Sequence, residues 1–175
     1  ARVYGYERIP ETRLADALPP QRRNLSLQRE ERTRDILTRL GLQEVITYRM
    51  TLPEKEARLF RDEARPEEDT RYVRLANPIA SDKVVMRRSQ LASVLEVVER
   101  NARVRERLAL FEIGPVFLPA EPGELPWEVD RLSIVLTGPR QQAGWQAADT
   151  GSMDFFDLKG ILHGLLEGLN LEGRA

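Results

Sequence analysis

The stretch of sequence that decides the fold is residues 108–118, LALFEIGPVFL, together with residues 131–137, RLSIVLT. Both runs are rich in β-branched and aromatic residues, and the turn sequence EPGE at residues 121–124 lies between them. Apolar runs bounded by glycine and proline are typical of β-strands. We therefore predict strands at Leu108–Ile113, Val116–Leu118 and Arg131–Thr137, with Gly114-Pro115 separating the first two.

Helices are predicted around these strands from capping residues and from apolar residues at helical spacing. The expected helices are about Leu27–Leu40 with Ser26 as N-cap, Pro53–Phe60, Gln90–Arg103 with Ser89 as cap, and Phe155–Leu169 with Asp154 as cap. Further strands are expected at Glu44–Met50, Tyr72–Leu75 and Val84–Met86, and the charged run Arg61–Thr70 predicts a loop. Strands that do not alternate regularly with helices favour the α+β class, with a mostly antiparallel sheet flanked by helices.

The 175 residues, 41% of them hydrophobic, are enough for one domain with a buried core. Residues 1–23 predict an N-terminal arm following an upstream domain, because turn residues and Pro19-Pro20 separate its few apolar side chains. Residues 24–175 then form the domain itself.

Composition excludes several kinds of chemistry. The chain has no cysteine and one histidine, His163, so it holds neither a thiol nucleophile nor a metal site with two histidines of its own. A net charge of −1 gives no overall attraction to nucleic acid or to an anionic membrane. No apolar run approaches the roughly 20 residues of a membrane span. Together these observations favour a cytoplasmic protein without a membrane partner.

No motif for catalysis or phosphate binding is visible, since no glycine-rich phosphate loop occurs. His163 falls on the polar face of the last predicted helix, which favours a solvated side chain. Asp154 and Asp157 resemble a carboxylate pair, but aspartates at a helix start are usually caps. The arginine pair Arg87-Arg88 could meet phosphates, although ordinary ion pairs are favoured at this net charge.

Two helix surfaces suggest contacts with other elements. In the first helix the apolar stripe is narrow and interrupted by Arg29, so we expect a subunit interface rather than a core face. The predicted interface residues are Leu25, Thr33, Ile36, Leu37 and Leu40. In the last helix Gly160, Gly164 and Gly168 recur every four residues, which would permit close approach by another backbone; chance drift on an exposed face is the alternative.

Several longer strings resemble one family. Residues 1–10, ARVYGYERIP, are similar to A-R-x-Y-G-Y-[DN]-x-I-P of the bacterial phenylalanyl-tRNA synthetase beta chain, and residues 41–48, GLQEVITY, to its G-[FL]-x-E-V-I-T-Y. Residues 77–91 resemble its N-P-[IL]-S and L-R-x-S-L-L strings, and residues 111–117, FEIGPVF, continue in register. The residues that match motifs and are expected to have structural roles are Asn77, Pro78, Arg87, Asn101, Glu112 and Gly114.

The resemblance implies the catalytic-like domain of that beta chain, with the fold of a class II synthetase catalytic domain. It implies no catalytic, cofactor-binding or metal-binding residue in this chain, because the family's active site lies on the alpha chain. In particular, Leu118 stands where an active synthetase would place an arginine that clamps ATP. The family's magnesium-binding acidic residues are expected upstream of Ala1. The region that corresponds to motif 3 is expected beyond the last helix, so the domain is expected to be truncated at its C-terminus.

The implied function is structural: the domain would contact the alpha chain within a heterotetramer of two alpha/beta pairs. That holoenzyme uses ATP and magnesium to attach phenylalanine to its tRNA, with this chain inactive alone. Two alternatives stay open, an autonomous adenylate-forming enzyme and a tRNA-binding module.

Overall fold

A computed structural model describes residues 2–12, 20, 22–60, 72–121, 123–142, 144–145 and 149–171. In chain order its elements are η1 (Tyr6–Arg8), α1 (Leu25–Arg39), β1 (Gln43–Glu44), β2 (Met50–Thr51), α2 (Pro53–Ala57), β3 (Val85–Met86), α3 (Leu91–Asn101), β4 (Leu108–Leu118), β5 (Trp127–Thr137) and α4 (Phe155–Gly168).

A pair of long antiparallel strands, β4 and β5, forms the centre of the molecule. The two strands pair along their whole length, from Leu108 opposite Thr137 to Leu118 opposite Trp127. The short strand β1 adds to the other side of β4 in parallel, and β2 pairs with β3 in a separate antiparallel ribbon. This arrangement of mostly antiparallel strands with helices beside them confirms the predicted α+β class.

The predicted break at Gly114-Pro115 is wrong, because β4 is continuous from Leu108 to Leu118. Proline is tolerated in a strand where it need not donate a ladder hydrogen bond. Strand β1 reaches only as far as Phe111, so one edge of β4 has no strand partner at Pro115.

The predicted strand Glu44–Met50 is also wrong over most of its length, since only its two ends belong to strands, β1 and β2. The predicted strand Tyr72–Leu75 is reduced to a single bridge between Arg74 and Val85. The loop predicted at Arg61–Thr70 lies outside the described residues.

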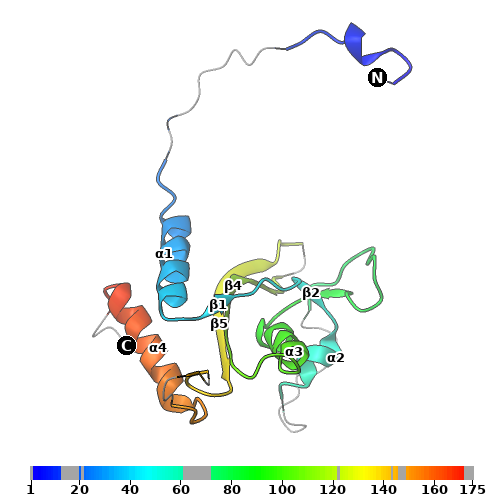
Figure 1. Ribbon diagram of the computed structural model, residues 1–175. Coiled ribbons are helices and arrows are strands. Elements are labelled where there is room, and N and C mark those ends of the chain that lie inside the picture. The colour runs from blue at the N-terminus through cyan, green and yellow to red at the C-terminus, as the bar shows by residue number, and fades with distance from the viewer. Residues whose placement is uncertain are drawn as a thin grey trace.

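The apolar core lies between α1, α4 and one face of the sheet, as Figure 1 shows on the side away from α2 and α3. Its buried members are Ile36, Leu37, Leu42, Ala109, Phe111 and Leu165. The expectation that the first helix contributes little to the core is therefore wrong. The buried residues of α1, Ile36 and Leu37, lie in its second half, whereas Leu25 is 57% exposed. The sequence prediction treats the apolar stripe of the whole helix as one surface and so does not distinguish the buried residues of its second half from its exposed start.

The ends of α1 follow from local chemistry. Asn24, and not Ser26, is the N-cap, because its Oδ1 accepts a hydrogen bond from the backbone N of Leu27 at 3.1 Å. At the other end Gly41 has a φ of +87°, the left-handed geometry in which glycine ends helices.

The last helix begins with a capping box. Asp154 Oδ1 accepts from the backbone N of Phe156 at 2.8 Å, and Asp157 Oδ2 accepts from the backbone N of Asp154 at 2.7 Å. The prediction that these two carboxylates are caps is confirmed. Arg140 also donates to Asp157 through Nε, which holds the pKa of that carboxyl below its usual value and ties the loop after β5 to α4.

The glycine ridge of α4 is covered in part, by side chains of α1 rather than by a backbone. A Cβ on Gly168 would lie 2.8 Å from Ile36 Cδ1, and one on Gly164 would lie 3.3 Å from Leu40 Cδ2. Nothing lies within 4 Å of a Cβ on Gly160. Two of the three glycines therefore let the two helices approach, and the third has no packing role among the described residues.

Residues 2–12 lie apart from the rest of the molecule in Figure 1 and contain the short helix η1. None of them is buried, and Val3, Tyr4 and Tyr6 are all more than half exposed. Among the described residues, no helix has the length and apolar character needed to cross a bilayer.

Candidate functional site

The face of β4 that points towards α3 carries a buried ion pair. Arg87 follows β3 directly, and its Nη1 lies 2.6 Å from Oε1 of Glu112, in the middle of β4. The two side chains are 1% and 3% exposed. Two charges removed from water in this way stay ionised only if each finds close partners.

Thr47 and Pro115 complete the hydrogen bonding of this pair. Arg87 donates through Nη1 to Thr47 Oγ1 at 2.9 Å and through Nε to the carbonyl of Pro115 at 3.0 Å. Thr47 Oγ1 in turn donates to Glu112 Oε2 at 2.8 Å. Because the guanidinium and the carboxylate are both buried and both partnered, the pair is a structural link between the segment before α3 and the central strand.

Gln90 extends this cluster onto β5. Its Nε2 donates to the carbonyl of Gly114 at 2.8 Å, and its Oε1 accepts from Ser133 Oγ at 2.9 Å. A Cβ on Gly114 would lie 3.0 Å from Arg87 Nη2, so a larger residue there would press on the guanidinium.

Among the described residues, the prediction of ion pairs for Arg87 and Arg88 is confirmed for Arg87 alone, whose pair is buried rather than an ordinary surface pair. The Arg88 guanidinium instead lies 5.6 Å from the centre of the Tyr72 ring. The structural matches Glu112 and Gly114 contact Arg87.

A second buried carboxylate, Glu56 of α2, holds the backbone of the segment that precedes α3. Its Oε1 accepts from the backbone N atoms of Arg88 and Ser89 at 2.9 and 3.2 Å, and its Oε2 accepts from Tyr72 Oη at 3.2 Å. Burial raises the pKa of Glu56 above its usual value. Burial, with the Glu56 carboxylate nearby, also raises the pKa of Tyr72 to about 12, so the phenol stays a hydrogen-bond donor.

The contacts of the two carboxylates could not be predicted from the sequence, although the resemblance gave Glu112 as a structural match. Glu56, Thr47 and Gln90 were missed because their partners lie between 16 and 65 residues away along the chain. Nothing distinguishes them locally from surface polar residues, and only the run of apolar residues around Glu112 signals that a charge there must be buried.

The end of β4 is where an active synthetase would place an ATP-clamping arginine. Leu118 is the last residue of β4 and pairs with Trp127, the first residue of β5. An aliphatic side chain cannot offset the charge of a phosphate, so this position does not fit ATP. The described residues also contain no group of three or more His, Cys, Asp or Glu side chains that could hold a metal ion.

The remaining predicted residues are scattered. Asn77 and Pro78 are exposed in the connection before β3, and Asn101 ends α3 with its Nδ2 donating to the carbonyl of Val97 at 2.8 Å. His163 is exposed on α4, as predicted. The five predicted interface residues divide: Ile36 and Leu37 belong to this chain's own core, whereas Leu25, Thr33 and Leu40 are at least partly exposed.

Comparison with known proteins gives one consistent answer. Residues 9–175 match the family model described as the phenylalanyl tRNA synthetase beta chain CLM domain. The chain is 37% identical over 174 residues to the phenylalanine–tRNA ligase beta subunit of Syntrophus aciditrophicus, covering 99% of this chain and 21% of that protein. It is 38% identical over 176 residues to the beta subunit of Syntrophotalea carbinolica, covering 98% of this chain and 21% of that protein. The chain thus spans about a fifth of the length of these relatives.

Among solved structures, a pyrrolysyl-tRNA synthetase from Desulfitobacterium hafniense superposes with a TM-score of 0.62 at 15% identity, covering 86% of this chain and 48% of that one. This similarity shows the fold, that of a class II synthetase catalytic domain. With the family model covering nearly all of the sequence, the chain belongs to the phenylalanyl-tRNA synthetase beta chain family.

Proposed function

We propose that this domain is a non-catalytic structural and assembly domain of the phenylalanine–tRNA ligase beta subunit and that it contacts the catalytic alpha subunit. The observation that carries the proposal is Leu118, an aliphatic residue at the end of β4 in a domain of class II fold. The complete enzyme would be a heterotetramer of two alpha/beta pairs in the cytoplasm, attaching phenylalanine to its tRNA with ATP and magnesium. Neither cofactor would be held by this domain.

The internal polar cluster supports a scaffolding role. The Arg87 guanidinium donates its hydrogen bonds to Pro115, Thr47 and Glu112, which all belong to this chain. Fully satisfied buried networks make one arrangement of the backbone strongly preferred. A rigid domain of this kind holds partner-contacting surfaces in place without binding a substrate.

The surface that would meet the alpha chain includes the exposed part of α1. Leu25 and Leu27 are 57% and 48% exposed, and Leu40 is 40% exposed at the C-terminal end of the helix. Apolar side chains of this kind are removed from water when a partner covers them. We propose that Leu25, Leu40 and the half-buried Thr33 lie in this contact.

Co-purification tests the contact. We expect Leu25→Glu in the full-length beta chain to weaken capture of a tagged alpha chain, because the new carboxylate would be desolvated at the interface. Glu31→Gln, which changes an exposed charge on the same helix, is the control. Unchanged capture by the Leu25 variant would contradict the proposed contact, provided that both variants melt at the temperature of the parent protein.

ATP–pyrophosphate exchange separates the proposal from an autonomous adenylate-forming enzyme. We expect no exchange by this chain alone and full exchange only when the alpha chain supplies the active site. Calorimetric titration should also show no saturable ATP binding tighter than about 1 mM, equivalent to about −4 kcal/mol. Exchange by this chain alone would favour the enzyme, and stoichiometric tRNA binding by it would favour the tRNA-binding module.

A further inference from the structure

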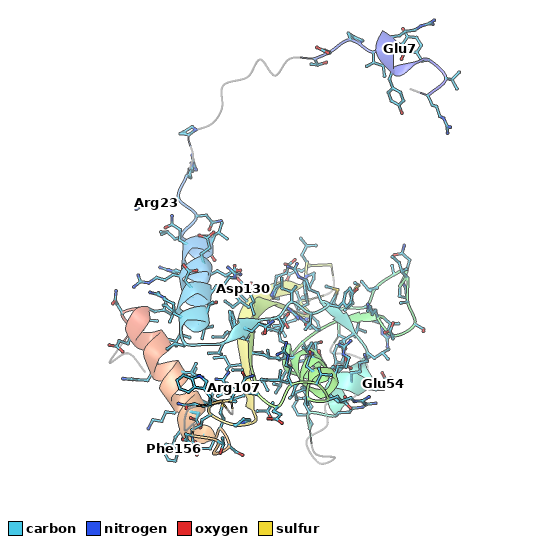
Figure 2. All side chains as sticks on the ribbon, in the orientation of Figure 1. Glu7, Arg23, Glu54, Arg107, Asp130 and Phe156 are labelled. Carbon is cyan, nitrogen blue, oxygen red and sulfur yellow. The ribbon has the colours of Figure 1, made fainter. Side chains whose placement is uncertain are left out.

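A polar cleft lies at the end of the sheet opposite Leu118, where α3 leads into β4. Its volume is about 460 Å³, within the usual range of small-molecule sites. Arg105 and Arg107, from the connection between α3 and β4, line it together with three residues that have amide side chains, Gln43, Asn101 and Gln142. Figure 2 shows Arg107 towards this end of the β4–β5 pair and Asp130 towards the other.

The charge of the cleft is positive and has no counter-charge among the described residues. No aspartate or glutamate lines it, and neither arginine forms an ion pair with a carboxylate of that part of the chain. Glu106 stands between the two arginines in sequence but is not among the lining residues. Among the described residues, the arginines that do pair with carboxylates are Arg34, Arg87 and Arg140, each with a closest N–O distance of 2.9 Å or less.

Arg107 is held in place although its charge is not matched. Its Nε donates to the backbone carbonyl of Arg140 at 3.1 Å, and the residue is half-buried. A single bond to Nε leaves the two terminal nitrogens of the guanidinium to point elsewhere. The planar fork of an arginine fixed in this way suits the oxygens of a phosphate or carboxylate.

The amide groups add neutral donors and acceptors around the two charges. Asn101 is oriented by its bond to the carbonyl of Val97, and its own backbone carbonyl accepts from the N atoms of Val104 and Arg105 at 2.9 Å each. The connection that carries both arginines is therefore turned by hydrogen bonds to the end of α3. We propose that this cleft binds a small phosphate-bearing ligand, with Arg105 and Arg107 on the phosphate and the amides on its polar remainder.

This inference does not rest on the proposed assembly role, because the cleft uses none of the α1 residues assigned to the alpha-chain contact. The experiment uses the full-length beta chain co-purified with its alpha chain. Phenylglyoxal, which modifies accessible guanidinium groups, is applied with and without about 10 mM inorganic phosphate or AMP, or about 10 μM tRNA. Labelled positions are identified by mass spectrometry. Arg103, exposed on the same connection but outside the lining, is the internal control.

The expected result is that phosphate and AMP protect Arg105 and Arg107 while Arg103 stays fully reactive. Equilibrium dialysis with radiolabelled AMP is analysed for sites beyond the active site assigned to the alpha chain. Arg105→Gln and Arg107→Gln should each weaken AMP binding at the additional site by about tenfold or more, the usual loss of a charged hydrogen bond, and Arg103→Gln should not. Arg107→Lys keeps the charge and should bind better than Arg107→Gln. Binding should also weaken as salt is added.

Four outcomes would overturn the proposal. Equal labelling of all three arginines with and without phosphate or AMP would show no site. Equal protection of Arg103 would show only general screening by the anion. Protection by tRNA alone would make the cleft a contact for a nucleic acid, and arginines already protected without added ligand would show that the alpha chain covers it.

Discussion

The buried pair of Arg87 and Glu112 gives the sharpest prediction, because removing one charge leaves the other without compensation. Glu112→Gln keeps the shape of the side chain and an oxygen that can accept from Arg87 Nη1, which is 2.6 Å away in the parent protein. It removes the negative charge. The remaining partners of the guanidinium, Thr47 Oγ1 and the Pro115 carbonyl, are neutral.

The magnitude follows from burial. With the Arg87 side chain only 1% exposed, water cannot replace the lost carboxylate. Breaking a buried pair by removing one partner costs about 3–5 kcal/mol, and the retained hydrogen bond places Glu112→Gln near the lower value. Since domains are stable by about 5–15 kcal/mol, this is a large share of the total. In a chain of this size, about 3 kcal/mol lowers the Tm by about 6–12 °C.

The assay is urea unfolding of the 175-residue chain followed by circular dichroism. Glu44→Gln is the matched control, since Glu44 pairs with Arg34 at 2.8 Å but both side chains are partly exposed, at 25% and 32%. Such a pair contributes about 0–1 kcal/mol. The double variant Arg87→Met/Glu112→Met removes both charges and should recover part of the loss. If Glu112→Gln costs no more than Glu44→Gln, the cluster is not the stabilising link inferred from its geometry.

Three further predictions concern single sites. Leu37→Glu places a carboxylate in the apolar core, where Leu37 is 0% exposed, and should cost several kcal/mol in the thermal melt; an unchanged Tm would return α1 to the interface assignment. Gly160→Ala should stabilise the protein by about 0.4–1 kcal/mol, because the new Cβ contacts no other residue. Gly138→Ala should destabilise it by more than that, because Gly138 has a φ of +91° and its Cβ would clash with the Glu106 carbonyl. Equal effects of the two substitutions would refute the packing argument. Glu56→Gln tests the raised pKa of Glu56, because the folded state holds the carboxyl proton more tightly than the unfolded state. The stability of the parent relative to the variant should therefore fall as pH rises above about 4.5. A stability difference that stays constant from about pH 4 to 7 would contradict the raised pKa.

The sequence predicts the elements whose signals are local. The caps of α4, the left-handed Gly41 and the apolar halves of β4 and β5 depend on residues within a few positions of one another. The first four residues of β5, WEVD, carry no such signal, because two of them are charged and the tryptophan is 65% exposed. They become a strand only because β4 pairs with them.

Contacts across long stretches of chain explain the other misses. Whether α1 contributes to the core depends on Phe111 and Leu165, which no periodicity within residues 25–39 can reveal. The polar cluster has the same origin, because Arg87 and Glu112 are 25 residues apart and meet through the placement of α3 on the sheet. The family resemblance identifies Arg87 and Glu112 as motif matches but does not predict that they contact each other.

The alternation of β4 connects the fold with the proposed function. Ala109, Phe111 and Ile113 point to the apolar core with α1 and α4, so Glu112 and Gly114 point to the opposite face. On that face the strand is held by charge-assisted hydrogen bonds rather than by apolar packing alone. A strand fixed on both faces cannot shift its register without moving a charge into the core and a phenylalanine into the polar cluster. The two ends of β4 are thereby fixed as well. Leu118 presents an aliphatic side chain where an active synthetase would place a cation, and Arg107, just before the strand, presents a cation at the opposite end. A class II sheet built in this way can serve as a rigid support for assembly. The phosphate site that we propose lies at the end of the sheet opposite Leu118.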